Sequence, residues 1–443
     1  MARTLARRYL LLPHKGPGEA QLLMLPSPDG WTCPFVDLER HSAVEGAPLV
    51  TAVRVDYGVD IALLRTVYRH AAEPGDYADL VIAVEILPSA WAPPAGSRWV
   101  TAAELELVDL AIPEHRAVIK AWFVEETGRV ASSSRRSPWA KPGWFSDVVT
   151  WIDDQLGCRS IQRTGPVEQV KNWSVSCLLK LPTSVGELWF KAVPVFFPGE
   201  VGVTATLAAE FPAQMPRLVA VDRERGWMLM HAFEGGLLRD ELDVERWEDA
   251  LRAYAGMQVW SVDRVDDLLA AGCNDRRFPV MFAQFEQLLA DDEFLGAALR
   301  PEEVVRLRDL LPELKALAAG LEATGIPCTL EHGDLHCRNV SSSLRFFDWS
   351  DACVAHPFFS LDYFLAPRGA AVEQTVGLKE RLVAAYLAPW ARFVSPEQLR
   401  IAVVSASRLA NVHYALSYYW YIAPLSDDDW TDMVALYLRE LLA

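Results

Sequence analysis

Cysteine is scarce and dispersed in this sequence. None of the cysteines forms a Cys-x-x-Cys pair; the seven stand at Cys33, Cys158, Cys177, Cys273, Cys328, Cys337 and Cys353. An odd, scattered set of this kind argues against a disulfide framework and indicates reduced thiols in a cytoplasm.

Long hydrophobic runs are missing as well. No stretch approaches the roughly 18–20 apolar residues that a membrane-spanning helix needs. The basic N-terminus is followed by an apolar run of only Tyr9–Leu12, which is too short for the core of a signal peptide. We therefore expect a soluble, cytoplasmic protein without a membrane partner.

Basic residues are fewer than acidic ones. Lys and Arg number 42 against 59 Asp and Glu, which gives a formal net charge of −17 at pH 7. Because nucleic-acid binding depends on basic side chains that neutralise phosphates, this balance argues against a nucleic-acid partner. It suits a cationic substrate, although in most acidic proteins the charge serves solubility alone.

The most informative stretch lies well past the middle of the chain. His332, Asp334 and Asn339 follow the pattern H-x-D-x-x-x-x-N between apolar runs. Asp348 comes nine residues after Asn339 and ends the apolar run Leu344–Phe347, which predicts a buried strand. These spacings place two carboxylates and an amide close together along the chain.

This set of side chains suits phosphoryl transfer from a nucleotide. One carboxylate, which we assign as Asp334, aligns the attacking hydroxyl and accepts its proton. Asn339 and Asp348 would hold Mg²⁺ on the phosphates, because this ion prefers hard oxygen ligands and keeps several waters. His332 is expected to stay neutral and to support the loop through hydrogen bonds.

A zinc site is the alternative for the same stretch. His332 and His336 are four residues apart, with Cys337 and Asp348 nearby. A helix would be needed to place both histidines on one face, whereas Gly333 directly after a strand favours a loop.

The motif H-G-D-L-H-x-x-N-V followed by F-D-W resembles the aminoglycoside phosphotransferase and choline kinase family of small-molecule kinases. The resemblance covers roughly residues 160–440. It implies an α+β, bilobal protein-kinase-like fold, with a small β-rich lobe over 144–233 and a larger helical lobe with the catalytic loop over 234–443. It also implies Mg²⁺ and ATP or GTP as cofactors.

The same resemblance indicates how the phosphates would be held. Lys191, on the second of two strands in the small lobe, would face the α- and β-phosphates. Glu200, at the start of the following helical run, would hold this lysine, and Glu210 at its far end is the less favoured candidate. A Gly-rich phosphate loop is missing, so Ser174 and Ser176 would offer hydroxyl and backbone N–H groups instead.

The adenine would meet the backbone between Met230 and Phe233, where an apolar strand enters a hinge. An ordinary core strand is the alternative for this segment. In the segment after the motif, family members often support the catalytic loop with an Asp. Ser360 occupies that position here, so support is expected from Asp362, two residues later. Asp351 is either a further group near the metal or a capping residue.

The last helices are rich in aromatic side chains that either line a substrate pocket or pack in the core. They are Tyr414, Tyr418, Tyr419, Trp420 and Tyr421.

Residues 1–126 are expected to form a separate strand-rich domain, and residues 127–143, rich in Ser, Pro and Gly, are typical of a linker. The apolar runs Tyr9–Leu12 and Leu22–Leu25 fit a hairpin with a longish loop. Thr101, with a glutamate three residues on, predicts a helix that begins with a capping box.

The layout of this domain resembles a degenerate Nudix domain. An active Nudix domain carries a Glu-rich helix whose carboxylates bind Mg²⁺. The comparable stretch, Thr51–Arg65, retains Arg54 and Gly58 but has no Glu pair. The resemblance therefore implies a cap or scaffold without hydrolase activity, and an unrelated small α+β domain is the alternative.

Together these features predict an enzyme that moves the γ-phosphoryl group of ATP or GTP to a hydroxyl of an amino sugar, aminoglycoside, amino alcohol or sugar. A nucleotide-binding pseudokinase with a regulatory or scaffolding role is one alternative. Intact Asp334, Asn339, Asp348 and Lys191 argue against it. The other is a phosphohydrolase acting through the N-terminal domain, which the missing Glu pair opposes.

Overall fold

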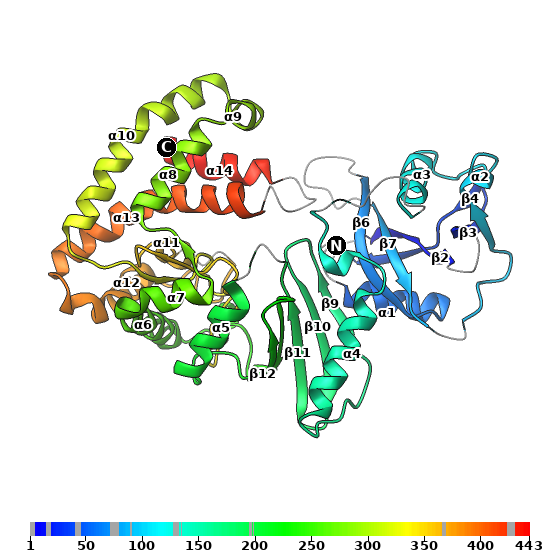
Figure 1. Cartoon of the computed structure of the whole chain (residues 1–443), viewed down its shortest axis with the longest axis horizontal. Helices are drawn as coiled ribbons and strands as arrows, with labels where there is room; N and C mark the ends of the chain where they lie inside the picture. Colours follow the sequence, from blue (N-terminus) through cyan, green and yellow to red (C-terminus); the bar gives the residue numbers. More distant parts are fainter. Residues whose placement is uncertain are drawn as a thin grey trace. The chain divides into compact units, whose positions relative to one another are not determined.

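The computed structural model describes most of the chain as helix and strand (Figure 1). The described residues are 5–14, 19–39, 46–70, 79–88, 91–126, 133, 135–194, 197, 199–365, 369–422 and 430–443. Helix makes up 47% and strand 22% of the structure, so the predicted mixed α+β class is confirmed. The chain divides into two compact units, Met1–Lys191 and Ala192–Ala443.

The first unit is rich in strands. They are β1 (Leu5–Leu11), β2 (Pro13–His14), β3 (Gln21–Ser27), β4 (Gly30–Thr32), β5 (Phe35–Glu39), β6 (Ile61–His70), β7 (Asp79–Ile86), β8 (Arg98–Thr101), β9 (Glu168–Asn172), β10 (Cys177–Thr183) and β11 (Gly186–Ala192). Its α-helices are α1 (Ala47–Tyr57), α2 (Ala102–Leu105), α3 (His115–Glu126) and α4 (Trp144–Gly157).

One sheet of the N-terminal part has the order β5-β1-β7-β6. Strand β1 pairs antiparallel with β5 and parallel with β7. Its side chains alternate between the two faces. Tyr9 and Leu11 pack in a cluster with Trp122 of α3, whereas Leu10 packs in another with Val53 of α1. The sheet therefore has a buried face against each of these helices.

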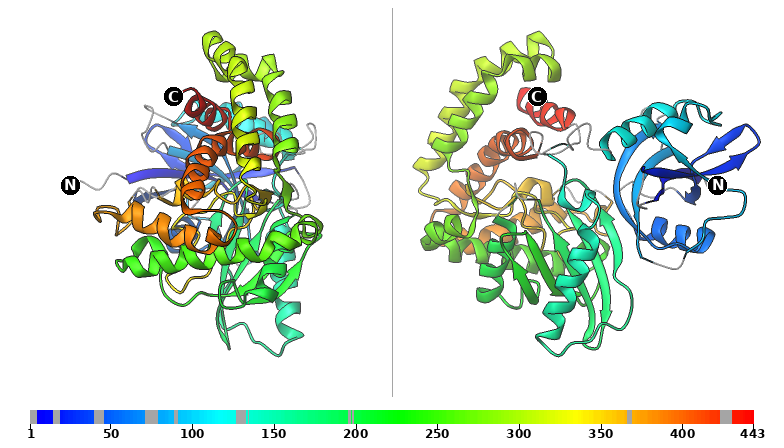
Figure 2. Two further views of the ribbon diagram at one scale, coloured as in Figure 1. Left: turned by 90° about the vertical axis from the view of Figure 1, so that its left-hand side faces the viewer. Right: turned by 45° about the vertical axis from the view of Figure 1, so that its right-hand side comes forward.

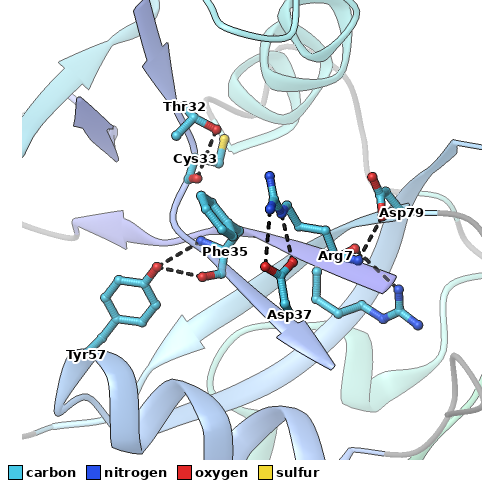
Figure 3. A network of polar contacts seen from close by, with 8 residues as sticks. Arg7, Thr32, Cys33, Phe35, Asp37, Tyr57 and Asp79 are labelled. Carbon is cyan, nitrogen blue, oxygen red and sulfur yellow. Dashed lines mark hydrogen bonds and ion pairs between the residues drawn. The ribbon is translucent and has the colours of Figure 1, made fainter. Parts of the chain in front are cut away.

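Figure 3 shows how α1 is tied to the edge strand β5. The hydroxyl of Tyr57, the last residue of α1, donates to the carbonyl of Phe35 at 2.7 Å and accepts from its N–H at 3.0 Å. Arg7 pairs with Asp37 at 2.8 Å, and the N–H of Arg7 donates to Asp79 at 2.8 Å. Tyr57 thus pairs backbone groups on a sheet edge.

The capping box predicted at Thr101 is confirmed. Its hydroxyl accepts from the N–H of Glu104 at 3.3 Å, and the Glu104 carboxylate accepts from the N–H of Thr101 at 2.9 Å. The hairpin predicted from Tyr9–Leu12 and Leu22–Leu25 is only partly right. Strand β3 pairs with the short β2, with β4 and with β8, while β1 joins the other sheet.

Part of the predicted linker 127–143 is packed. Residues 127–132 and 134 lie outside the described residues. Arg136 pairs with Glu125 of α3. Trp139, in a short 3₁₀ turn at Pro138–Ala140, is 2% exposed. The segment packs although its Ser, Pro and Gly content is typical of a linker, because burying the Trp139 ring removes a large apolar area from water.

Strands β9 to β13 form a five-stranded sheet with the order β12-β13-β11-β10-β9. The boundary between the two compact units falls inside β11, after Lys191. The division predicted from the sequence (1–126, 127–143, 144–233 and 234–443) stays a prediction. The resemblance of the first of these parts to a Nudix domain also stays a prediction; α1 carries one acidic residue, Asp56.

The second unit is mainly helical. Its strands are β12 (Leu218–Asp222), β13 (Trp227–His231), β14 (Asn274–Asp275), β15 (Thr329–Glu331) and β16 (Cys353–Ala355). Its α-helices are α5 (Gly199–Glu210), α6 (Val244–Ser261), α7 (Val265–Ala271), α8 (Phe278–Leu289), α9 (Asp292–Ala298), α10 (Pro301–Ala323), α11 (Leu361–Leu365), α12 (Leu378–Leu387), α13 (Pro396–Ser417) and α14 (Thr431–Leu442).

These helices share one large apolar core with the strands that carry the catalytic motif. Helix α13 packs against α10 and α14 (Figure 2). The core includes Leu330 of β15 and Phe346 and Trp349 of the following loop, each fully buried. None of the described helices is long and apolar enough to cross a membrane.

Helix α5 lies close against the end of α7 because two of its residues lack a side chain. A Cβ atom on Gly199 would lie 2.1 Å from the carbonyl oxygen of Gly272, and one on Gly202 would lie 2.1 Å from that of Ala271. Glu200 stands between them in the first turn of α5, with 1% exposure. The two glycines therefore fix where this carboxylate lies.

We predict that Gly202→Ala and Gly256→Ala change stability in opposite directions. Gly256 lies inside α6, and a Cβ there would meet no atom within 4 Å. Alanine should therefore stabilise α6 by about 0.5–1 kcal/mol, as it does in an open helix interior. At position 202 the contact with Ala271 should destabilise the fold by about 1–3 kcal/mol. Urea denaturation measures both changes in unfolding free energy. If they have the same sign, the close packing of α5 against α7 does not depend on Gly202.

Candidate active site

The catalytic motif lies in the loop between β15 and β16. These strands pair antiparallel and place Glu331 opposite Cys353. Gly333, directly after β15, has φ +79, and a Cβ there would lie 2.3 Å from the carbonyl oxygen of Asp351. Only glycine allows this close approach without strain. The loop is thus closed at its base by backbone packing.

A buried carboxylate stands behind the loop. Glu331 is 0% exposed, and its carboxylate accepts from the Tyr254 hydroxyl at 3.1 Å and from the Gln258 amide at 3.3 Å. Burial raises the pKa of Glu331 to about 7. The Tyr254 hydroxyl also accepts from the N–H of His332 at 2.9 Å, so one side chain of α6 holds two consecutive residues of the motif.

His332 is buried inside the loop. It is 0% exposed, and its ring packs on Trp349 with centroids 4.4 Å apart. Nε2 lies 3.1 Å from the carbonyl oxygen of Phe347; because a carbonyl only accepts, Nε2 carries the proton. Burial lowers the pKa of His332 to about 4, against the opposing effect of the carboxylates of Asp334 and Asp348.

Asp334 presents its carboxylate to solvent while its neighbours orient it. The side chain is 42% exposed. The Asn339 amide nitrogen donates to its Oδ2 at 3.2 Å and to its backbone carbonyl at 2.9 Å. His336 Nδ1 accepts from the N–H of Arg338 at 3.1 Å, so its protonated Nε2 faces Asp334 Oδ2 at 3.5 Å.

The loop brings Asn339 and Asp348 to adjacent backbone positions. The N–H of Phe347 donates to the Asn339 carbonyl at 3.1 Å. Asp348 has φ +66, a left-handed conformation that is uncommon outside glycine. Its Oδ1 accepts from the Ser350 hydroxyl at 3.0 Å. Strained backbone of this kind occurs mainly at functional sites.

The buried strand predicted over Leu344–Phe347 is wrong. This segment forms a single antiparallel bridge, between Phe346 and Val340. Leu344 has φ +63, which an extended strand does not allow. The apolar run leaves a turn at residues 341–344 and continues as irregular backbone, with Phe346 buried in the core.

The phosphate-binding residues predicted from the sequence lie in separate elements. Lys191 is 7% exposed near the end of β11, and Glu200 is buried in α5. Ser174 and Ser176 lie in the turn between β9 and β10, where the N–H of Trp173 donates to the Ser176 carbonyl at 2.9 Å. Their roles in nucleotide binding stay predictions.

The predicted hinge is close to the catalytic loop. Met230 is in β13 opposite Leu218, with 8% exposure. Phe233, just beyond this strand, stacks on Phe347 with ring centroids 4.8 Å apart and an interplanar angle of 21°. Phe347 directly precedes Asp348. Phe233, predicted to lie by the adenine, is therefore held beside Asp348, which is predicted to bind the metal.

Asp362, the second residue predicted to support the loop, bonds to a residue outside the loop. Asp362, on α11, accepts a hydrogen bond from Ser407 of α13. The buried carboxylate with partners at the motif is Glu331, which the sequence analysis missed. Its signal was a charged residue between Leu330 and His332, at a position where the neighbours predict a buried strand. Support of the loop by Asp362 stays a prediction.

The zinc alternative does not fit the geometry. His332 Nε2 is committed to the Phe347 carbonyl, whereas the ring of His336 lies against Tyr363 and Asp334. Among the described residues no three His, Cys, Asp or Glu side chains gather where they could hold a metal ion.

A series of aromatic rings, the aromatic wall, extends from the catalytic loop along α11, α13 and α14, and its members Tyr414, Tyr418 and Tyr437 pack against the apolar core. Successive ring centroids lie 5.1–6.2 Å apart along the series His336, Tyr363, Tyr414, Tyr437, Tyr418 and Trp430. Burial, then Tyr363 and the carboxylates of Asp334 and Asp351, raise the pKa of Tyr437. Tyr418 begins a π-helix, Tyr418–Ile422, and the side chain of Tyr421 lies outside the described residues.

No protein-family model and no curated protein matches this sequence. Solved structures with a similar fold include a choline/ethanolamine kinase family protein from Mesorhizobium loti, at 16% identity over 63% of this chain and 88% of that one, with a TM-score of 0.45. Another is an ethanolamine kinase from Plasmodium vivax, at 10% identity over 73% of this chain and 92% of that one, with a TM-score of 0.48. A third is an aminoglycoside phosphotransferase from Streptomyces rimosus, at 16% identity over 58% of this chain and 97% of that one, with a TM-score of 0.37.

We predict that Glu331→Gln changes the pH dependence of stability. The folded state raises the pKa of Glu331 to about 7 from an ordinary 4.5, so the contribution of this group is complete below pH 4.5 and is lost as the pH rises through 7. From pH 5 to pH 8 the variant should gain about 2–3 kcal/mol in unfolding free energy relative to the wild type. Urea denaturation at both pH values measures this, and a constant difference would contradict it.

Proposed function

We propose that this protein is a small-molecule kinase that transfers the γ-phosphoryl group of ATP or GTP to an acceptor hydroxyl. The observation that carries the proposal is the geometry around Asp334. Its exposed carboxylate is oriented by Asn339 and His336 on a loop whose base is buried. Phosphoryl transfer gains most from such positioning, because little of the barrier is proton transfer.

In this proposal Asp334 accepts a hydrogen bond from the acceptor hydroxyl and takes its proton as the phosphoryl group is transferred. The Asn339 amide and the protonated Nε2 of His336 hold the carboxylate in one orientation. The neutral ring of His332 fixes the turn at Phe347 and adds no charge. The residues of the loop thus align the nucleophile.

Asn339 and Asp348 fit a magnesium site. The Asn339 amide nitrogen donates to Asp334, which leaves the amide oxygen as the atom able to bind a cation. The Asp348 carboxylate is held by Ser350 on an adjacent backbone position. When bound, Mg²⁺ would neutralise charge on the β- and γ-phosphates.

The remaining nucleotide contacts follow the resemblance drawn from the sequence. Lys191, held by Glu200, would bind the α- and β-phosphates, and Ser174 and Ser176 would contact the phosphates from their turn. The hinge between Met230 and Phe233 would meet the base. The burial of Lys191 and Glu200 supports these roles, since charged side chains are seldom buried without a function or a charged partner.

The aromatic wall supports an acceptor that carries an amine. Tyr363 is 47% exposed, and its ring lies against that of His336. Aromatic faces attract organic cations, and the carboxylates of Asp334 and Asp351 add negative charge near the same rings. We propose amino alcohols and amino sugars, including aminoglycosides, ahead of neutral sugars.

We predict that Asp334→Asn strongly slows turnover while nucleotide binding survives. The amide cannot accept the hydroxyl proton, so kcat should fall by about 10²–10⁴. Coupled phosphorylation assays over an acceptor library measure kcat, and calorimetry measures the affinity for Mg²⁺–ATP and Mg²⁺–GTP. Asp432→Asn, on an exposed position of α14, is the matched control. Nucleotide binding by the wild type without turnover of any acceptor would favour the pseudokinase alternative.

We predict that Tyr363→Leu raises KM for amine acceptors about 3- to 30-fold, because a cation–π contact is worth about 0.5–2 kcal/mol. KM for neutral sugars should stay unchanged, and Tyr363→Phe, which keeps the ring, should retain most of the affinity. Steady-state kinetics with paired amine and hydroxyl analogues make the comparison. A parallel rise for both classes would show that Tyr363 serves packing alone.

A further inference from the structure

The edge strand of the sheet that carries Lys191 is covered by the N-terminal domain. Strand β9 is the last in its sheet and contacts α1 and β6 of that domain (Figure 1). The Gln169 side chain, 3% exposed, accepts from the N–H of Leu63 at 2.8 Å and donates to its carbonyl at 3.0 Å. Asn172 donates to the carbonyls of Leu63 and Leu64, both at 3.1 Å.

The helix α1 reaches the same strand through its N-cap. The N–H of Gly46 donates to the Val170 carbonyl at 2.9 Å. A Cβ on Gly46 would lie 2.7 Å from the Gln169 carbonyl oxygen, so a side chain there would push α1 away from β9. This domain thus binds β9 from Gln169 to Asn172, the strand that leads directly into the turn before β10.

The segment after the N-terminal domain binds that turn itself. The indole N–H of Trp139 donates to the Trp173 carbonyl at 2.6 Å, and the Ser137 hydroxyl donates to the Ser174 carbonyl. Trp139 is anchored by burial and by an edge contact with Trp144, whose ring centroid is 6.0 Å away. Two consecutive peptide carbonyls are therefore fixed by one buried segment.

Fixing these carbonyls also fixes two amide groups. In a trans peptide the C=O and the following N–H point in opposite directions. The carbonyl of Trp173 points toward Trp139 and that of Ser174 toward Ser137, so the N–H groups of Ser174 and Val175 point to the other side of the turn. Consecutive N–H groups on one side of a turn form a concave site that binds anions such as phosphate.

We infer that Ser137 and Trp139 are positioning residues for the nucleotide phosphates, and that the N-terminal domain serves as the fixed support of the turn at Trp173–Ser176. This inference rests on the proposed function and explains how a chain without a Gly-rich loop can present backbone amides to a triphosphate. The domain then acts on nucleotide affinity without contributing a group to the chemical step.

The experiment compares two double variants of the full chain. Ser137→Ala with Trp139→Phe removes the two hydrogen bonds to the turn and keeps the aromatic ring. Trp91→Phe with Thr150→Val is the matched control, because Trp91 donates to the Tyr57 carbonyl at 2.7 Å and Thr150 to the Ser146 carbonyl at 2.9 Å, both in the same unit. Calorimetry gives Kd for Mg²⁺–ATP or Mg²⁺–GTP, whichever binds, and for the matching nucleoside, which has no phosphates.

The first variant should bind the nucleotide about tenfold more weakly, as expected for two lost hydrogen bonds, with KM for the nucleotide rising in parallel and kcat staying within about threefold. Nucleoside affinity and the control variant should stay unchanged. An unchanged nucleotide Kd, or equal losses for nucleotide and nucleoside, would overturn the inference.

The wild type separates this inference from the proposed function. Binding without turnover refutes the kinase proposal and leaves the inference to be decided by the Kd comparison. Absence of nucleotide binding by the wild type overturns both. Gly46→Val, which displaces α1 from β9, tests the role of the N-terminal domain. If it weakens nucleotide binding without weakening nucleoside binding, the domain supports the turn at Trp173–Ser176. Equal weakening of both would overturn this role of the domain.

Discussion

The catalytic loop depends on one hydroxyl group that serves two neighbours. Tyr254 donates to the buried carboxylate of Glu331 and accepts from the N–H of His332, the first residue of the motif. A buried carboxylate is costly unless hydrogen bonds compensate it, and a buried N–H without a partner costs a similar penalty. Because Tyr254 serves both groups, it ties α6 to two consecutive residues at the base of the loop.

The motif could be predicted from the sequence because its interactions are local. Asp334 and Asn339 lie five residues apart in one turn-rich segment, where short spacing allows the two hydrogen bonds from the Asn339 amide to Asp334. Tyr254 could not be found this way, since it lies 77 residues from Glu331 and nothing in its own surroundings distinguishes it from a core tyrosine. The predicted strand before Asp348 failed for another reason. Apolar runs indicate burial, and burial does not distinguish an extended strand from a tight turn.

The same limit applies to the N-terminal part of the chain. The capping box at Thr101 and the strand runs were visible because caps and alternation are properties of short windows. The packing of the predicted linker could not be seen in the same way. Most of its residues are of the Ser, Pro and Gly kind that indicates a linker, but its packing is set by one residue of another kind, the buried Trp139. An indole in a polar segment is better taken as a sign of docking, since its burial and its N–H both need a partner.

Two turns, one in each compact unit, are held in the same way. Asp348 is held in a left-handed conformation by a turn whose neighbours, Phe346 and Phe347, pair with Val340 and Asn339. The turn after β9 is held by side chains of Ser137 and Trp139, from a different segment. In each case the backbone is fixed by partners from outside the turn. A reaction with a loose transition state gains little from a stronger base and much from fixed geometry, so under the proposed function such supports matter by fixing where the binding groups lie.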